Sequence, residues 1–247
     1  MIHKLFLSLS IVLVSLQAHS QKVSLIKSFT HSFYGRSSHY SYTYNKQGNI
    51  TSKTESHHYI DEKGKRVTID APRTSRYTNF KDSITYQKGL KKFKMVLNKQ
   101  GLVEQEVLLN YGRSVRKYKY DAQKHLIYEE ETNQRASRTS RSEIFYKYSQ
   151  GNLVKQIRIA YTPYYGETRA DSTITNYEYY LDKPNSSSNA HFGQNYRGKS
   201  SKNLLKSYWD KGGQKTTYLY KFDKKGRVRE RIMEDTPQSR TTYEYYD

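Results

Sequence analysis

Residues 218–232 read YLYKFDKKGRVRERI, and this stretch contains the pattern that decides the fold. Aromatic residues alternate with others up to Phe222, the run Asp223-Lys-Lys-Gly226 interrupts them, and alternation resumes at Val228. An Asp at the start of such a run accepts hydrogen bonds from the backbone that follows it. A Gly at the fourth position adopts the positive φ that closes a type I turn with a bulge. Period-two alternation on both sides therefore predicts one antiparallel β-hairpin.

The same pattern recurs along the chain. In each copy an alternating aromatic or apolar run leads into a short polar turn, and alternation then restarts on Leu, Ile or Val. One copy is weak evidence, but about six copies in one chain predict a series of β-hairpins. The predicted turn residues are Asn45, Gly48, Asp61, Gly64, Asn98, Gly101, Asp121, Gly151, Asp210, Gly213, Asp223 and Gly226.

The two faces of the predicted strands differ in chemistry. Adjacent side chains in a strand point to opposite faces, so Tyr118 and Tyr120 share one face while Lys119 lies on the other. A sheet with one aromatic face must roll into a barrel or fold into two layers to cover it. The sequence thus predicts an all-β antiparallel meander of roughly fourteen to sixteen short strands. The predicted aromatic ladder comprises Tyr42, Tyr44, Tyr118, Tyr120, Tyr146, Tyr148, Tyr218, Tyr220 and Phe222.

The first residues have the features of an export signal. Lys4 precedes a mostly apolar stretch, 5–16, that is too short to span a bilayer, and small residues precede Gln21. This pattern predicts a signal peptide over 1–20, with an uncleaved anchor as the alternative. One all-β domain then covers 21–247, with the Ser-, Asn- and Gly-rich stretch 183–202 as a candidate hinge. No second apolar run is long enough for a transmembrane helix.

Composition narrows the compartment and the partners. The chain has no Cys, so an exported protein of this kind fits the periplasm, outer membrane or exterior of a Gram-negative bacterium. The formal net charge is +20, and Tyr accounts for 26 residues, which favours an ordered fold. Outside the inner membrane the polyanions that such a surface would attract are lipopolysaccharide and anionic glycans, whereas export disfavours nucleic acid. The competing explanation is that Lys and Arg only keep the sheet soluble and unpaired at its edges. Oligomeric state is left open.

Two resemblances add to this interpretation. The segments Tyr220-Lys-Phe222-Asp223-Lys-Lys-Gly226-Arg227-Val228 and Tyr118-Lys-Tyr120-Asp121 resemble the YD repeats of RHS-type secreted bacterial proteins, although the spacing is irregular and His125 and Asn152 stand where Gly is usual. Residues 203–245, which begin with Asn203-Leu-Leu-Lys206, resemble the end of a secreted Gram-negative family of unknown function. That second resemblance implies a porin-like β fold.

No catalytic set emerges from the sequence. His57 and His58 are adjacent in a predicted strand and so point apart, which disfavours a shared metal. Glu104 and Glu106 would lie on one strand face roughly 7 Å apart, a spacing within the range of glycosidase carboxylates, but exposed Glu pairs are common in sheets. We therefore expect no enzyme, no cofactor and no metal.

The leading hypothesis is an envelope binding or scaffold module for an anionic glycan. The alternatives are an outer-membrane barrel and an envelope-polymer hydrolase in which Glu104, Glu106 and His57 meet.

Overall fold

The protein is described here by a computed structural model covering residues 23–63, 65–110, 113–135, 138–164 and 167–247. The predicted signal peptide over 1–20 and the turn residue Gly64 lie outside these ranges. The described chain is all-β, apart from the short 3-10 helices η1 (Asn189–Phe192) and η2 (Asn195–Arg197). The strands are β1 (Ile26–Phe33), β2 (Arg36–Tyr44), β3 (Ile50–Ile60), β4 (Arg66–Thr68), β5 (Arg73–Asn79), β6 (Ser83–Lys88), β7 (Lys91–Leu97), β8 (Val103–Leu108), β9 (Arg113–Tyr120), β10 (Leu126–Arg135), β11 (Arg138–Ser149), β12 (Asn152–Tyr164), β13 (Glu167–Pro184), β14 (Asn203–Asp210), β15 (Thr216–Phe222), β16 (Val228–Met233) and β17 (Thr236–Tyr245).

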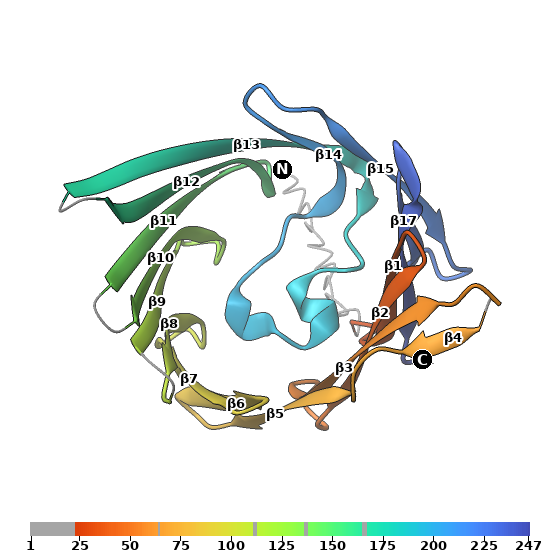
Figure 1. Cartoon of the computed structure of the whole chain (residues 1–247), viewed down its shortest axis with the longest axis horizontal. Coiled ribbons are helices and arrows are strands. Elements are labelled where there is room, and N and C mark those ends of the chain that lie inside the picture. Colours follow the sequence, from red (N-terminus) through yellow and green to blue (C-terminus); the bar gives the residue numbers. More distant parts are fainter. Residues whose placement is uncertain (1–22, 64, 111–112, 136–137, 165–166) are drawn as a thin grey trace, which may run out of the picture.

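Sixteen of the described strands form a closed antiparallel barrel, seen end-on in Figure 1. Each strand pairs with the next along the chain, and β1 pairs with β17 to close the ring. The short β4 pairs only with the end of β3, and β3 continues its own pairing with β5. The predicted antiparallel meander is confirmed, and its aromatic face is covered by closure into a barrel rather than by a second layer.

The Asx-x-x-Gly turns have the geometry that their sequence predicts. At Asn45 the side-chain Oδ1 accepts hydrogen bonds from the N–H groups of Gln47 and Asn49, both at 3.0 Å, and Gly48 has φ +79°. The turns at Asn98 and Asp223 repeat these contacts, with Gly101 and Gly226 at positive φ. Asp61 accepts the same pair of bonds.

Three turns depart from the simple pattern. After Asp121 the left-handed position is taken by Lys124, at φ +70°, rather than by Gly or by His125. Gly151 follows Gln150, and both have positive φ, which gives a two-residue type I′ hairpin. After Asp210 the positive φ belongs to Gly212 rather than Gly213, because the Gly213 N–H bonds to Asp210 O in a type II turn.

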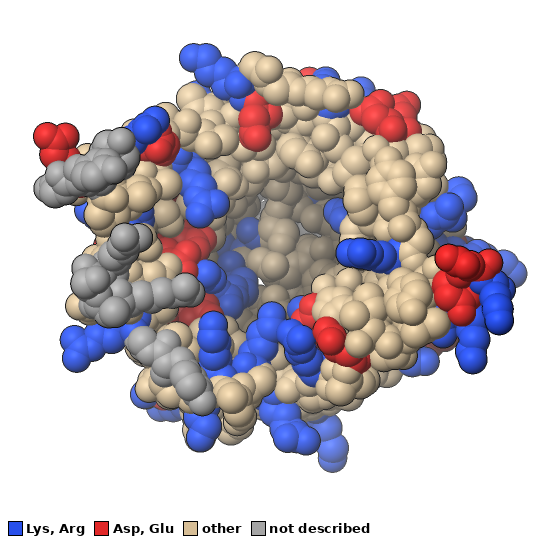
Figure 2. All heavy atoms as spheres, in the orientation of Figure 1, with Lys and Arg blue, Asp and Glu red and all other residues tan. Residues whose placement is uncertain are grey.

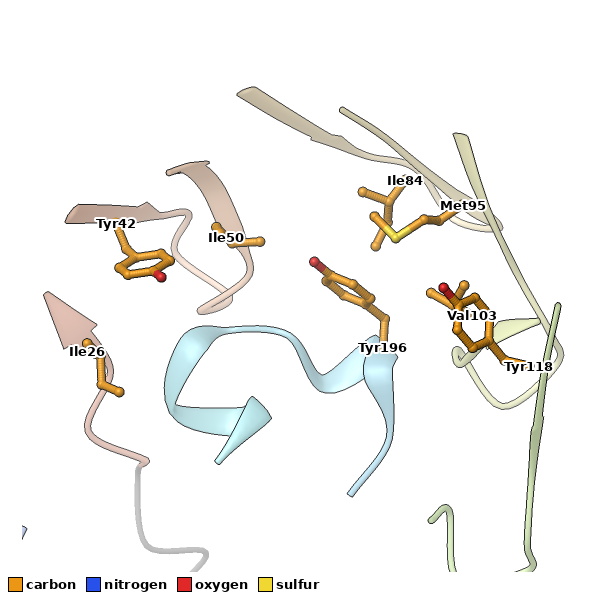
Figure 3. Packing of buried hydrophobic residues seen from close by; sticks show 8 residues of the cluster. All are labelled: Ile26, Tyr42, Ile50, Ile84, Met95, Val103, Tyr118 and Tyr196. Carbon is orange, nitrogen blue, oxygen red and sulfur yellow. The ribbon is translucent and has the colours of Figure 1, made fainter. Parts of the chain in front are cut away.

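The aromatic ladder faces the barrel interior. Tyr42 and Tyr118 are buried, and both pack into a core with Ile84, Met95 and Val103. Figure 3 shows this cluster gathered around Tyr196, which projects from a separate segment of chain. The other predicted members Tyr44, Tyr120, Tyr146, Tyr148, Tyr218 and Tyr220 are partly buried, whereas Phe222 is 38% exposed.

A plug, residues 185–202, connects β13 to β14 through the barrel interior (Figure 1). It lies within 183–202, the stretch predicted as a candidate hinge. Two glycines let it approach the wall: a Cβ at Gly193 would stand 2.5 Å from Gly48 O, and one at Gly198 would stand 2.6 Å from Lys124 O. We call the end of the barrel with turns 45–49, 98–102, 121–125 and 223–227 the plug end, and the opposite end the mouth.

Candidate functional site

A cavity of the described chain lies at the plug end, between the plug and the wall turns. This plug-end cleft has a volume of about 770 Å³, which is within the usual range for small-molecule sites. Wall turns contribute Gln100 and Gln123, and the plug contributes Ser188 and Asn195. The plug therefore forms one side of the cleft and the barrel the other.

The lining of the cleft is basic and rich in neutral polar groups. Its charged residues are Lys124, Lys199 and Lys202, and all three are exposed. No Asp or Glu is among its described lining residues. Apolar side chains complete its surface, and the amides offer both donors and acceptors. The amide residues are Asn49, Asn79, Gln100, Gln123, Asn185 and Asn195, and the larger apolar ones are Phe80, Ile84, Leu97, Leu102 and Tyr196.

Backbone contacts hold the three lysines in place. The Lys199 N–H donates to Lys124 O at 2.8 Å, and the Lys202 N–H donates to Gly151 O at 2.9 Å. His125 forms a short parallel bridge with Lys199, and its ring stacks on Tyr148 with centroids 4.5 Å apart. The lysines thus project from fixed backbone where plug and wall meet.

A pair of buried side-chain amides holds the chain where the plug ends and β14 begins. Asn152 Nδ2 donates to Asn203 Oδ1 at 3.0 Å, and the Asn203 N–H donates back to Asn152 Oδ1 at 2.9 Å. Asn203 Nδ2 also donates to Leu181 O at 2.9 Å. Only 3% of Asn152 and 6% of Asn203 is exposed, so losing either amide would leave buried polar groups unsatisfied.

An ion pair between the partly buried Arg197 and a buried carboxylate anchors the plug. Arg197 lies 3.0 Å from Glu106 of β8 and donates to Tyr118 OH at 3.2 Å. Glu106 also accepts hydrogen bonds from the hydroxyls of Tyr86 and Tyr118. Burial alone would raise the pKa of Glu106, but Arg197 and these hydroxyls outweigh it and hold that pKa below its ordinary value. The carboxylate is therefore ionised and structural.

The three residues of the hydrolase hypothesis have separate surroundings. A β-bulge opposite Val96 and Leu97 of β7 places Glu104 as an extra residue, so Glu104 is exposed while Glu106 is buried. The alternation that would put both carboxylates on one face is broken there. His57 instead contacts Glu55 at 3.2 Å and Ser38 at 2.9 Å.

The outer wall of the barrel carries lysines. Because Met95, Tyr118 and Tyr146 face inward, their strand neighbours face outward. We define the outer lysine patch as Lys92, Lys94, Lys117, Lys119 and Lys147, all exposed. Among the described residues there is no helix long and apolar enough to cross a membrane.

Sequence reasoning missed the residues that shape the cleft and its anchor. Arg197 and Tyr196 lie in a stretch without periodicity, and their partners are distant in sequence. One signal was present: Asn203 opens the Asn-Leu-x-x-Lys stretch already singled out for its resemblance to a secreted family. Its buried amide explains why an Asn suits that position.

Comparisons with known proteins identify a fold. No protein-family model and no curated protein matches the chain. A crystal structure of a porin-like protein from Bacteroides uniformis aligns with a TM-score of 0.64 and 13% identity, covering 90% of this chain and 98% of that one. A porin-like protein from Bacteroides vulgatus aligns with a TM-score of 0.59 and 13% identity, covering 90% and 99%. The chain therefore has a porin-like antiparallel barrel fold, as the second resemblance implied. The YD-repeat resemblance stays a prediction.

Proposed function

We propose that this chain is an exported, non-enzymatic β-barrel of the bacterial cell envelope whose plug-end cleft binds an anionic glycan. The observation that carries this proposal is the lining of the cleft, where Lys124, Lys199 and Lys202 occur with no Asp or Glu among the described lining residues. Three ammonium groups around one concave surface favour a ligand with repeated negative charge.

The neutral groups of the cleft support a sugar rather than a bare polyanion. A sugar ring presents hydroxyls, which amides such as Gln100 and Gln123 can both donate to and accept from. It also presents apolar C–H groups, which suit the apolar surface around Leu102 and Tyr196. The cleft volume of about 770 Å³ is larger than one sugar ring needs. A short stretch of a sugar polymer therefore fits in the cleft.

The outer wall favours an aqueous setting for the barrel. Lysines of the outer lysine patch, such as Lys94 and Lys117, are exposed near the middle of their strands. A Lys on the lipid face of a transmembrane barrel costs about 2 to 4 kcal/mol at the bilayer midplane. This cost is the argument against the alternative of an outer-membrane barrel. Partitioning of the exported protein between detergent and aqueous phases tests it, and we expect the aqueous phase.

Binding can be measured by retention of the exported protein on immobilised heparin and lipopolysaccharide, with neutral dextran as the control matrix. We expect retention on both anionic matrices, elution by salt, and no retention on dextran. The triple variant K124M/K199M/K202M should elute at lower salt. If each contact is worth about 0.5 kcal/mol, the combined loss is about tenfold in affinity.

A matched variant separates a site from general charge attraction. K92M/K94M/K117M removes the same number of exposed lysines from the outer lysine patch and should elute close to wild type. Equal weakening of both triple variants would show that binding follows net charge, and the cleft would lose its role. Absence of retention of the wild-type protein would reject the polyanion proposal.

A further inference from the structure

A second, smaller cavity lies inside the barrel. This mouth chamber has a volume of about 170 Å³, and Gln194, Tyr196 and Arg197 of the plug form one side of it. Its remaining lining residues are Lys53 and Glu55 of β3, Ser75 and Tyr77 of β5, and Tyr86 and Lys88 of β6.

The mouth chamber lies on the mouth side of the plug. β3 runs from Ile50 at the plug end toward the mouth, and Tyr196 packs in the layer of Ile50 and Ile84. Lys53 and Lys88 stand further along β3 and β6, toward the mouth. Seen along the barrel axis, the molecule is hollowed and basic side chains gather around the hollow (Figure 2). The chamber is thus distinct from the plug-end cleft, although Tyr196 borders both.

Positive charge in the mouth chamber exceeds negative charge. Arg197 is neutralised by Glu106 at 3.0 Å, which leaves Lys53 and Lys88 against Glu55. Lys88, whose side chain is 59% exposed, forms only a long ion pair with Glu55, at 3.9 Å, which is too far for a hydrogen bond. The Lys53 ammonium lies over the Tyr40 ring, 4.5 Å from its centroid, and forms no ion pair with another described residue. Burial lowers the pKa of Lys53, and the attraction of Glu55 does not offset this effect.

The chamber also offers a neutral donor and a size limit. Tyr77 lines it and stacks on Tyr86, with centroids 5.2 Å apart. The Tyr86 hydroxyl is engaged by Glu106, whereas the Tyr77 hydroxyl makes no hydrogen bond to another described residue. Since a water molecule takes about 30 Å³, the chamber holds the equivalent of about five or six waters. One small molecule fits, and a polymer does not.

We propose that the mouth chamber binds a small organic carboxylate of single-sugar size, such as a hexuronate. Its carboxylate would lie between the ammonium groups of Lys53 and Lys88. Its hydroxyls would meet Tyr77 OH and the amide of Gln194. This site uses a different set of lysines from the plug-end cleft and does not depend on glycan binding there.

Calorimetric titration of the full exported protein with sodium D-glucuronate tests the site, with D-glucose and sodium sulfate as comparison ligands. We expect glucuronate to bind and glucose not to bind. Lys53→Met keeps the apolar stem and should weaken glucuronate binding at least tenfold, as should Lys88→Met. Lys211→Met, an exposed lysine outside the chamber, should bind like wild type.

The variant K124M/K199M/K202M should retain glucuronate affinity, which separates this site from the plug-end cleft. No binding of glucuronate to wild type, or unchanged affinity in folded Lys53→Met, would overturn the proposal. Sulfate that competes as strongly as glucuronate would overturn the assignment of the ligand as a sugar-sized acid. Melting curves of each variant confirm that a lost signal reflects the site.

Discussion

Arg197 is the residue whose removal should most disturb the plug. Its partner Glu106 is 5% exposed and keeps only the hydroxyls of Tyr86 and Tyr118 once the guanidinium is gone. Removing one partner of a buried ion pair costs about 3 to 5 kcal/mol. Because two donors remain on the carboxylate, we expect Arg197→Met to lower the free energy of unfolding by about 3 kcal/mol.

Denaturant unfolding, followed by far-ultraviolet circular dichroism, measures this loss. The exposed pair Arg169–Asp171, with side chains 68% and 62% exposed, supplies the control, and Arg169→Met should change stability by less than about 1 kcal/mol. The double variant E106Q/R197M should recover part of the loss, because it no longer buries an unpaired charge.

The pH dependence of Arg197→Met provides a second readout. In wild type the pKa of Glu106 is held below its ordinary value of 4.5, so its stabilisation is present above that value and is lost as pH falls through the folded pKa. In the variant burial dominates and that pKa rises, so the carboxylate destabilises the fold at neutral pH. The stability gap should therefore narrow as pH falls. A loss no larger than that of Arg169→Met, with no dependence on pH and no recovery in the double variant, would refute this reasoning.

Three further predictions concern the plug, the seam and the interior. Gly198→Ala should lower the melting temperature of the protein more than Gly226→Ala does. Both glycines have positive φ, but only at Gly198 would an added Cβ lie against backbone, 2.6 Å from Lys124 O. β14 and β15 share only two registered pairs, and Tyr180 OH bonds to Tyr218 O across this seam. Tyr180→Phe should thus cost about 1 kcal/mol and speed amide hydrogen exchange there. Burial raises the pKa of Tyr148 from 10.0 to about 12. The neutral Tyr148 side chain therefore stabilises the fold fully below pH 10, and this stabilisation is lost as pH rises through 12. In an alkaline titration, tyrosinate absorbance should rise together with unfolding.

The hairpins could be predicted from sequence because their determinants are local. Asn45 and Gly48 lie within one turn, and the side chain of one and the φ of the other suffice to close it. The alternation around Tyr118 likewise fixed which face turns inward. The sequence could not distinguish a closed barrel from a two-layer sheet. Closure of the barrel depends on the pairing of β1 with β17, more than two hundred residues away.

The candidate site could not be predicted from the sequence, because its interacting residues are also far apart in the chain. Arg197 of the plug pairs with Glu106 of the wall, and Asn152 bonds to Asn203, about fifty residues later in the chain. Neither pair has a local pattern. A single bulge also reversed the relation of Glu104 to Glu106, which strict alternation cannot anticipate.

Hydrogen exchange with and without an anionic polysaccharide tests the central claim most directly, because it locates the ligand on the barrel. With saturating heparin we predict slower exchange of backbone amides at 98–102, 121–125 and 185–202, where the plug-end cleft lies. Exchange in β7 and β9 beneath the outer lysine patch should be unchanged. Protection confined to β7 and β9, with none in the plug, would contradict the account.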